Sequence, residues 1–252
     1  MSDFNKWNTA AIGYAGQTAA VDAGLRAYML RVYNYMAAAV ALTGVVAYAT
    51  FSAAVVTDAA GKITSLTPFG QAIFSGPLSI VLLLGTLGLV FFISFRINRL
   101  QYTTAMTLFM VYAALLGVTL SSIFLAYTGA SITRVFFISA ASFGALSLYG
   151  YTTQRDLSAM GSFMIMGLFG IIIASLVNIF LKSSGLEWAI SVLGVGIFAG
   201  LTAYDTQRIK EMYDAMDDDG TMGRKAIMGA LSLYLDFINL FLMLLRLVGD
   251  RR

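Results

Sequence analysis

The residues of this chain with the clearest chemical potential are two aspartates in apolar surroundings. Asp236, with Asn239 close by, lies in ALSLYLDFINLFLMLLRL, a run apolar enough to cross a bilayer. Asp205 stands in GLTAYDTQRIK, where another apolar run gives way to charged residues. A charged side chain at mid-membrane depth costs roughly 2.5–3.5 kcal/mol on insertion scales and usually faces a protein interior or a cavity. Both acids are therefore candidate functional residues, and the alternative is a structural hydrogen bond between helices.

If the two carboxyl groups meet, they cannot both ionise cheaply, so the pair should share one proton over a wide pH range. Loss of that proton would set repulsion against packing, as a gate requires. Carboxylate oxygens also suit calcium, although carbonyls, waters or Asn239 would have to complete its shell of about six to eight ligands. We therefore predict that Asp205 and Asp236 form a pH sensor and gate that ligates calcium weakly and transiently, with Asn239 on the ion path.

The composition excludes several other chemistries. Of the 252 residues, 59% are hydrophobic and 12% charged, and the mean hydropathy is +0.80, which indicates an integral membrane protein. Cysteine and histidine are absent, which removes thiol nucleophiles, thiolate metal sites and the usual zinc ligand. The basic residues form no stripe, so nucleic-acid binding is not expected. No cofactor is predicted; calcium enters as the permeant ion.

The positioning elements are membrane-crossing helices. A span needs about 20 mainly apolar residues, and a barrel would instead show alternating segments of about ten. The sequence predicts an all-α membrane protein with seven spans, at about 32–56, 77–95, 102–127, 130–152, 157–181, 188–207 and 226–248.

Domain organisation and orientation follow from the same pattern. Residues 1–31 are expected to form a mobile polar tail, and residues 32–252 the transmembrane domain. With the N-terminus in the cytoplasm and the C-terminus outside, the inner loops collect ten of the sixteen basic residues, in accord with the positive-inside rule. These ten are Lys6, Arg26, Arg31, Arg96, Arg99, Arg155, Arg208, Lys210, Arg224 and Lys225.

The depth of the two acids sets a geometric requirement. Asp205 is expected near the cytoplasmic boundary, whereas Asp236 lies ten residues inward from Ala226, or roughly 15 Å along a helix. Helix tilt, local unwinding or a deep cytoplasmic cavity would be needed to bring them level. Elsewhere, Gly196 and Gly200 form a GIFAG pattern that predicts close approach of another helix backbone.

The sixth and seventh spans are joined by EMYDAMDDDGTMGRK, with acids at Asp214 and Asp217–Asp219. The spacing does not fit an EF-hand, because Ala226 stands where the twelfth-position glutamate is required. We interpret this segment as a solvated loop, with attraction of cations to the cytoplasmic mouth as the minor alternative.

The motifs resemble the transmembrane Bax inhibitor motif family, the Bax inhibitor-1-like proteins, and in particular its bacterial members. YDTQ closes the sixth span, LSLYLDFINLFLMLLRL forms the seventh, and LRVYNYM leads into the first. The resemblance implies a central seventh helix wrapped by the other six and a pH-sensitive calcium leak. It places the aspartate pH sensor on Asp205 and Asp236, and a latching arginine on Arg99 or, alternatively, Arg96. The chain departs from the family pattern in its longer acidic loop and in lacking an acid in the second span.

Two other functions remain open from the sequence. Paired aspartates on adjacent helices also define intramembrane aspartyl proteases, although their Gly-x-Gly-Asp stretch is missing before Asp236; we do not expect an enzyme. Some bacterial relatives are thought to modulate a membrane-bound quality-control protease, and the tail would then be the contact. The expected partners are calcium and the lipid bilayer, with a membrane-bound protease as the partner under this alternative. The expected location is the bacterial inner membrane.

Overall fold

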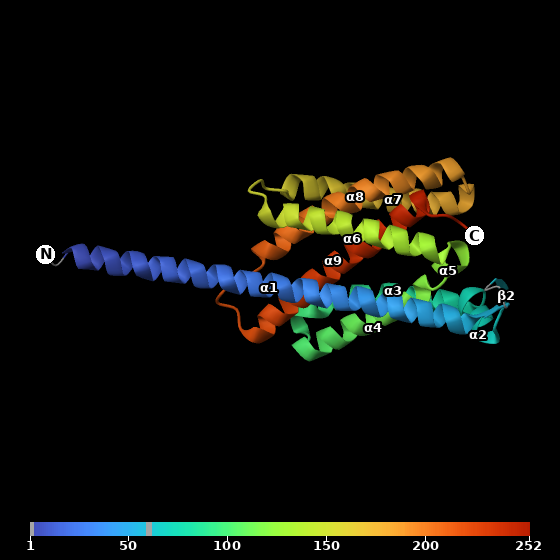
Figure 1. The fold of residues 1–252 in the computed structure, drawn as a ribbon, viewed down its shortest axis with the longest axis horizontal. Helices are drawn as coiled ribbons and strands as arrows, with labels where there is room; N and C mark the ends of the chain where they lie inside the picture. Colours follow the sequence, from blue (N-terminus) through green and yellow to red (C-terminus); the bar gives the residue numbers. More distant parts are fainter. Residues whose placement is uncertain (1–2, 59–61) are drawn as a thin grey trace.

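A computed structural model of the chain describes the backbone of residues 3–58 and 62–252 and the side chains of residues 22–58 and 62–252. Long helices run side by side as a bundle, and the two termini lie at opposite ends (Figure 1). The elements in chain order are α1 (Asp3–Ala54), β1 (Val55–Thr57), β2 (Ile63–Leu66), α2 (Pro68–Phe74), α3 (Pro77–Arg96), the 3-10 helix η1 (Ile97–Arg99), α4 (Tyr102–Leu120), α5 (Ile123–Ala126), α6 (Gly129–Thr152), α7 (Ser158–Leu181), α8 (Ser184–Glu211) and α9 (Asp219–Val248).

The predicted all-α membrane class and the number of spans are confirmed. Within the described residues, seven helical stretches are long and apolar enough to cross a bilayer. An odd number of spans places the termini on opposite sides, as Figure 1 shows. The stretches are Asp22–Ala54, Pro77–Arg99, Tyr102–Ala126, Gly129–Thr152, Ser158–Leu181, Ser184–Glu211 and Asp219–Val248.

The chain is already helical before the predicted start of the first span. α1 is a single helix from Asp3 to Ala54, so it continues without a break through residue 32. Tyr28 and Met29 are buried in the core, so part of the stretch 22–31 packs against the transmembrane helices. The apolar residues of this stretch are interrupted by charges, which hid the helix start. The predicted mobility of residues 1–21 lies outside the described side chains.

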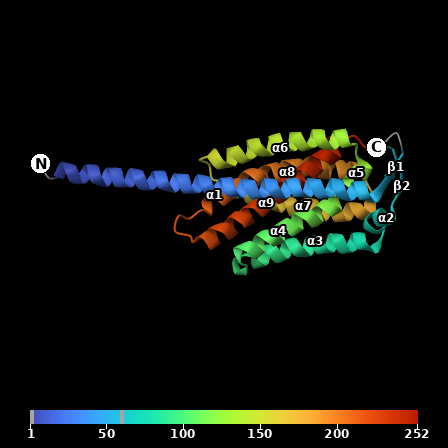
Figure 2. The same cartoon turned by 60° about the horizontal axis from the view of Figure 1, so that its bottom comes forward.

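A short hairpin that the sequence analysis did not predict lies between α1 and α2. β1 and β2 pair antiparallel, with Val55 opposite Leu66 and Val56 opposite Ser65. Both prolines of the chain follow, Pro68 at the start of α2 and Pro77 at the start of α3, where a missing N–H costs nothing. The hairpin therefore lies at the end of the bundle remote from the N-terminus (Figures 1 and 2).

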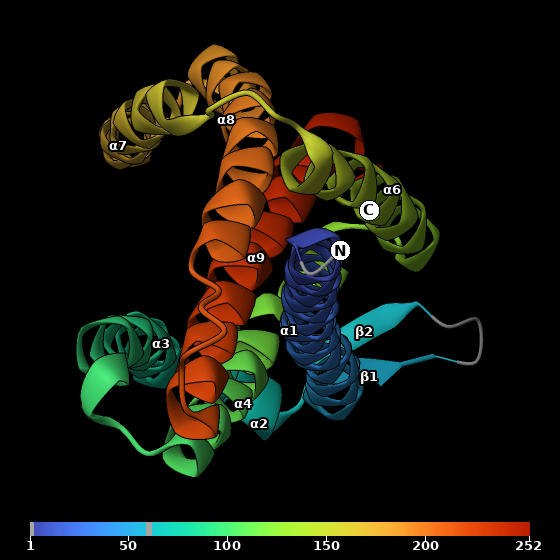
Figure 3. The same ribbon diagram turned by 90° about the vertical axis from the view of Figure 1, so that its left-hand side faces the viewer.

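α9 is the most buried of the seven membrane-crossing stretches in the described residues. In its membrane-crossing window 61% of the residues are buried, against 6% in α7 and 11% in α3. α9 packs against α1, α4, α6 and α8, whereas α7 packs chiefly on α8, and α3 on α4. Seen along the bundle, α9 runs between the α7–α8 pair and the α3–α4 pair (Figure 3). Four neighbours thus form the shell around α9, and α3 and α7 lie outside that shell.

Glycines set the close approach of the helices around Asp205, but they are not the predicted ones. Among the described residues, a side chain at Gly196 would meet nothing within 4 Å, and the atoms nearest to one at Gly200 belong to the flexible Met164 side chain. The GIFAG prediction of a backbone contact is therefore wrong. Instead, Gly150 of α6 lies directly on the Ala203 backbone, and Gly161 of α7 lies on the Tyr204 ring. α6 and α7 thereby hold the turn of α8 that carries Asp205.

The start of α9 is fixed by the acidic loop. Asp218 caps the helix, because its carboxylate accepts hydrogen bonds from the backbone N–H groups of Gly220 and Thr221, at 3.0 and 3.2 Å. Asp217 forms an ion pair with Lys225 at 2.6 Å, and Asp214 accepts from the Met216 N–H at 2.9 Å. These three acids thus have structural partners within the loop and the first turns of α9.

Removing the cap is expected to loosen the first turn of α9. In Asp218→Ala, the amides of residues 220 and 221 lose their acceptor and should exchange faster with deuterium. Hydrogen bonds from the Thr221 side chain and backbone lower the pKa of Asp218. The cap therefore contributes fully above the ordinary pKa and is lost as pH falls through the lowered one, so variant and wild type should converge at strongly acid pH. Asp219→Ala, next in the chain, is the control; equal effects of the two substitutions would contradict the capping role.

Candidate functional site

The structure brings Asp205 and Asp236 together. Asp205 lies on α8 and Asp236 on α9, two helices that pack closely against each other. The two carboxyl groups are within hydrogen-bonding reach of one another and also act on each other as like charges. A hydrogen bond between two carboxyl groups requires that one of them carries a proton. The two acids are therefore neighbours across the α8–α9 contact.

The tilt of α9 explains how Asp205 and Asp236 reach the same depth in the bundle. Both helices are unbroken at the aspartates, since α8 runs from Ser184 to Glu211 and α9 from Asp219 to Val248. α9 crosses the bundle diagonally (Figure 1), so part of its advance along the axis is lateral. The pair consequently forms without unwinding of either helix.

The surroundings of Asp236 offer its carboxyl group little besides Asp205. Asp236 is 5% exposed, and it stands in a buried stripe of α9 with Leu233, Phe237 and Leu240. Its Oδ2 atom is buried without a hydrogen-bond donor from the described residues. A buried carboxylate without donors is costly, whereas a protonated carboxyl is tolerated. Asp205 is therefore the main polar neighbour of the Asp236 carboxyl group.

Asp205 is half-buried and has a cation nearby. The charge that acts on it besides Asp236 is the guanidinium of Arg208, three residues further along α8. Arg208 is exposed and lies in the last turn of α8, which ends at Glu211. Arg208 was expected only in an inner loop, although its i+3 spacing from Asp205 on a helix could have indicated the contact.

Hydroxyl groups connect three helices beside Asp205. Tyr33 of α1 bonds to Ser147 of α6 at 2.7 Å, and Ser147 bonds to Thr206 of α8 at 2.9 Å. Thr206 donates its single proton to the Thr202 carbonyl at 2.7 Å. Since each hydroxyl has one proton, Ser147 must donate to Thr206, and Tyr33 must donate to Ser147. This chain fixes α1 and α6 against the helical turn that follows Asp205.

The remaining predicted site residues do not join the pair in this structure. Arg96 and Arg99, the latch candidates, are exposed around η1, and neither belongs to the three ion pairs found in the described part of the chain. Asn239 lies one turn beyond Asp236 and donates from Nδ2 to the Leu235 carbonyl of its own helix at 2.8 Å. Asn239 is half-buried, so it stays adjacent to the pair without a hydrogen bond to it among the contacts described.

Comparison with known proteins decides the family. The family model described as "Inhibitor of apoptosis-promoting Bax1" matches residues 25–252. The chain belongs to the Bax inhibitor-1 family. Among the family's bacterial proteins, an uncharacterised protein of Rickettsia prowazekii is 52% identical over 231 residues, covering 92% of both chains. Inner membrane protein YbhL of Escherichia coli is 48% identical over 234 residues, covering 91% of this chain and 94% of YbhL.

The region that the Bax inhibitor-1 family model matches includes both aspartates. It also includes the seven membrane-crossing stretches, apart from residues 22–24 of the first. A further relative, an uncharacterised protein of Caulobacter vibrioides, is 43% identical over 258 aligned residues and is covered completely, as is this chain. The chain is therefore an integral membrane protein of this family, with the family match covering residues 25–252.

Proposed function

We propose that the protein is a passive calcium leak whose opening is controlled by protonation of Asp205 and Asp236. The observation that supports this proposal is the direct contact of the two carboxyl groups at a buried position between α8 and α9. With a shared proton the pair links the two helices; without it the pair carries two like charges.

The repulsion between two ionised carboxylates is large enough to drive opening. Two unit charges about 4 Å apart repel by about 4 kcal/mol at an effective dielectric constant of about 20. The net stability of a folded domain is itself only about 5–15 kcal/mol. Loss of the shared proton can therefore displace α8 from α9 without unfolding the bundle, and flux is expected to rise as pH rises.

Calcium fits the open state better than the closed one. Ionised carboxylates are hard oxygen ligands of the kind calcium prefers, and in the closed state the Asp236 carboxyl is shielded from solvent. Two acids supply only part of a calcium shell, so waters and carbonyl groups complete it, with Asn239 as a further ligand on the ion path. Such incomplete ligation lets the ion leave again, as permeation requires.

The orientation follows from charge. With the N-terminus in the cytoplasm and the C-terminus outside, Arg26, Arg155 and Arg208 lie at the cytoplasmic end, in accord with the positive-inside rule. The E. coli relative is named an inner membrane protein, and we place this chain in the same kind of membrane. Asp205 is then the member of the pair that lies nearer the cytoplasm.

Reconstitution tests the function directly. The full chain in calcium-loaded liposomes, with an external calcium indicator, is expected to release calcium faster than protein-free liposomes and faster at mildly alkaline than at mildly acid pH. Flux no greater than that of protein-free liposomes at every pH would refute the leak. Flux that falls as pH rises would refute the direction of gating.

Arg208 is expected to tune the pH at which the leak opens. Its positive charge stabilises the ionised form of Asp205, so Arg208→Gln should retain the shared proton to higher pH and shift the flux profile upward by about half a pH unit, since the side chain is exposed and screened. Arg99→Gln is the matched comparison: Arg99 belongs to none of the ion pairs in the described part of the chain, so removing its charge should leave the flux profile unshifted. Equal shifts in the two variants would contradict the assignment to Arg208.

A pair of neighbouring aspartates is also the catalytic feature of an aspartyl protease, which is the enzymatic alternative. Such a site needs room for a peptide and a water molecule beside the acids, whereas here both helices are continuous and Asp236 is closed off by packing. Cleavage of a membrane substrate that disappears in either Asp→Asn variant would favour the enzyme over the leak.

A further inference from the structure

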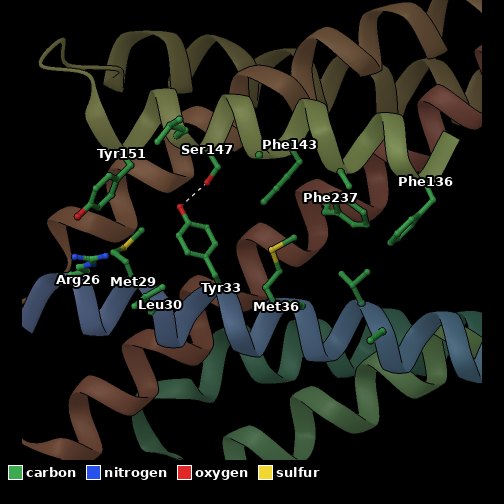
Figure 4. Close-up of a pocket in the computed structure, with 16 residues that line it drawn as sticks. Arg26, Met29, Leu30, Tyr33, Met36, Phe136, Phe143, Ser147, Tyr151 and Phe237 are labelled. Carbon is green, nitrogen blue, oxygen red and sulfur yellow. Dashed lines mark hydrogen bonds between the residues drawn. The ribbon is translucent and has the colours of Figure 1, made fainter. Parts of the chain in front are cut away.

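A large apolar groove separates α1 from α6. It encloses about 880 Å³, and Phe237 of α9 contributes to its lining. Its outer edges are open, because Leu30 of α1 is 53% exposed and Leu148 of α6 is 63% exposed. Figure 4 shows the side chains of the two helices facing each other across this space. The groove therefore opens sideways, towards the hydrocarbon that surrounds a membrane-spanning bundle.

The polar groups of the groove gather towards one end. Arg26 and Tyr151 lie at the mouth nearest the N-terminus, and Figure 4 shows the Tyr151 hydroxyl and the Arg26 guanidinium turned towards each other. Further in, the walls are formed by apolar side chains such as Met36, Phe136 and Phe143. The groove is thus amphipathic along its length, with a positive charge at one end.

The length of the groove matches one leaflet of a bilayer. From Arg26 to Ala41 is a 15-residue advance along α1, or about 22 Å, whereas half of the hydrocarbon core is about 15 Å. The remaining length corresponds to the headgroup region at the Arg26 end. A second cavity of about 310 Å³ shares Val40, Phe136 and Phe237 with the groove and continues it towards the other end of the bundle.

Occupancy of this space follows from its size and lining. Close-packed proteins do not keep empty spaces of this volume, and apolar cavities are not filled by water. A transmembrane helix, about 10 Å across with its side chains, would have to pass the Tyr33–Ser147 hydrogen bond, which crosses from α1 to α6 at 2.7 Å (Figure 4). A flexible acyl chain can pass beside this bond.

We propose that the α1–α6 groove binds an anionic phospholipid, with its phosphate at Arg26 and Tyr151 and an acyl chain along the apolar walls. The guanidinium provides paired donors that match phosphate oxygens, and the tyrosine hydroxyl adds another donor. The lipid holds α1 and α6 together where protein side chains leave them apart.

Two substitutions separate the headgroup from the chain. Arg26→Gln removes the charge at the mouth. Gly144→Leu fills the groove, since a side chain at Gly144 meets no atom of the described residues within 4 Å. The matched controls are Arg155→Gln, an exposed arginine at the same end of the bundle, and Gly170→Leu, another open glycine on the exposed face of α7.

The test is native mass spectrometry of the detergent-solubilised full chain with phosphatidylglycerol or phosphatidylcholine carrying identical acyl chains. We expect one phosphatidylglycerol to be retained in preference to phosphatidylcholine, roughly fivefold weaker retention of phosphatidylglycerol in Arg26→Gln, and weaker retention of both lipids in Gly144→Leu. The controls should behave as wild type. Equal retention of the two lipids by wild type, equal losses in Arg26→Gln and Arg155→Gln, or a bound protein in place of lipid would each overturn the proposal. None of these readouts depends on calcium flux.

Discussion

Asp236→Asn is expected to abolish the pH dependence of calcium flux while leaving the bundle folded. Asparagine has nearly the shape of the protonated acid, and its amide can donate to the Asp205 carboxylate permanently. The link between α8 and α9 should then persist at every pH, and the leak should stay close to its closed level. In the wild type, by contrast, the loss of one proton allows flux to rise by at most about tenfold per pH unit.

The control for this substitution lies on the same helix. Asp219→Asn removes an exposed carboxylate from the first turn of α9 and should leave the flux profile as in wild type. Asp205→Asn should reproduce the effect of Asp236→Asn, because either substitution removes one partner of the shared proton. A retained pH response in both single variants would show that the sensor lies elsewhere.

Gly150→Ala is expected to be the most destabilising small substitution near the site. The added methyl group would collide with the Ala203 backbone of α8, which cannot move aside as a flexible side chain can. Overpacking of this kind costs typically about 1–3 kcal/mol. It would also push Ser147 of α6 away from Thr206, breaking the hydroxyl chain beside Asp205. The midpoint of thermal unfolding in detergent should fall by several degrees.

Gly144→Ala provides the matched control on the same helix. Within the described part of the chain, a methyl group at Gly144 meets nothing within 4 Å, and alanine is more favourable than glycine in a helix by roughly 0.5–1 kcal/mol. This variant should unfold at the wild-type temperature or slightly above it. Equal destabilisation by the two substitutions would contradict the close contact between α6 and α8.

The sequence was informative where a single physical requirement dominates. Hydrocarbon thickness fixes the length of an apolar span, so seven spans could be counted from the lengths of the apolar runs. The cost of a buried charge singled out Asp205 and Asp236, and the structure places them in contact. Their depth could not be derived in advance, because the diagonal course of α9 depends on packing against four other helices.

The features that escaped prediction depend on contacts between distant segments. Tyr33, Ser147 and Thr206 are ordinary residues in apolar helices, and only the fold aligns their hydroxyls. Gly150 carries no local motif, since its partner is the backbone of Ala203. The β1–β2 hairpin was hidden because VVT and ITSL are too short to stand out between long apolar runs. α9 begins at Asp219, before its apolar part, because Asp218 caps the helix there.

The most direct test of the account is whether the pair holds a proton at neutral pH. Infrared spectroscopy of the protein in lipid detects the C=O stretch of a protonated carboxyl group separately from ionised carboxylates. We predict such a band at neutral pH, its loss as pH rises in step with increasing calcium flux, and its absence in Asp236→Asn. A wild-type spectrum without this band at neutral pH, or with an identical band in Asp236→Asn, would contradict proton sharing by Asp205 and Asp236.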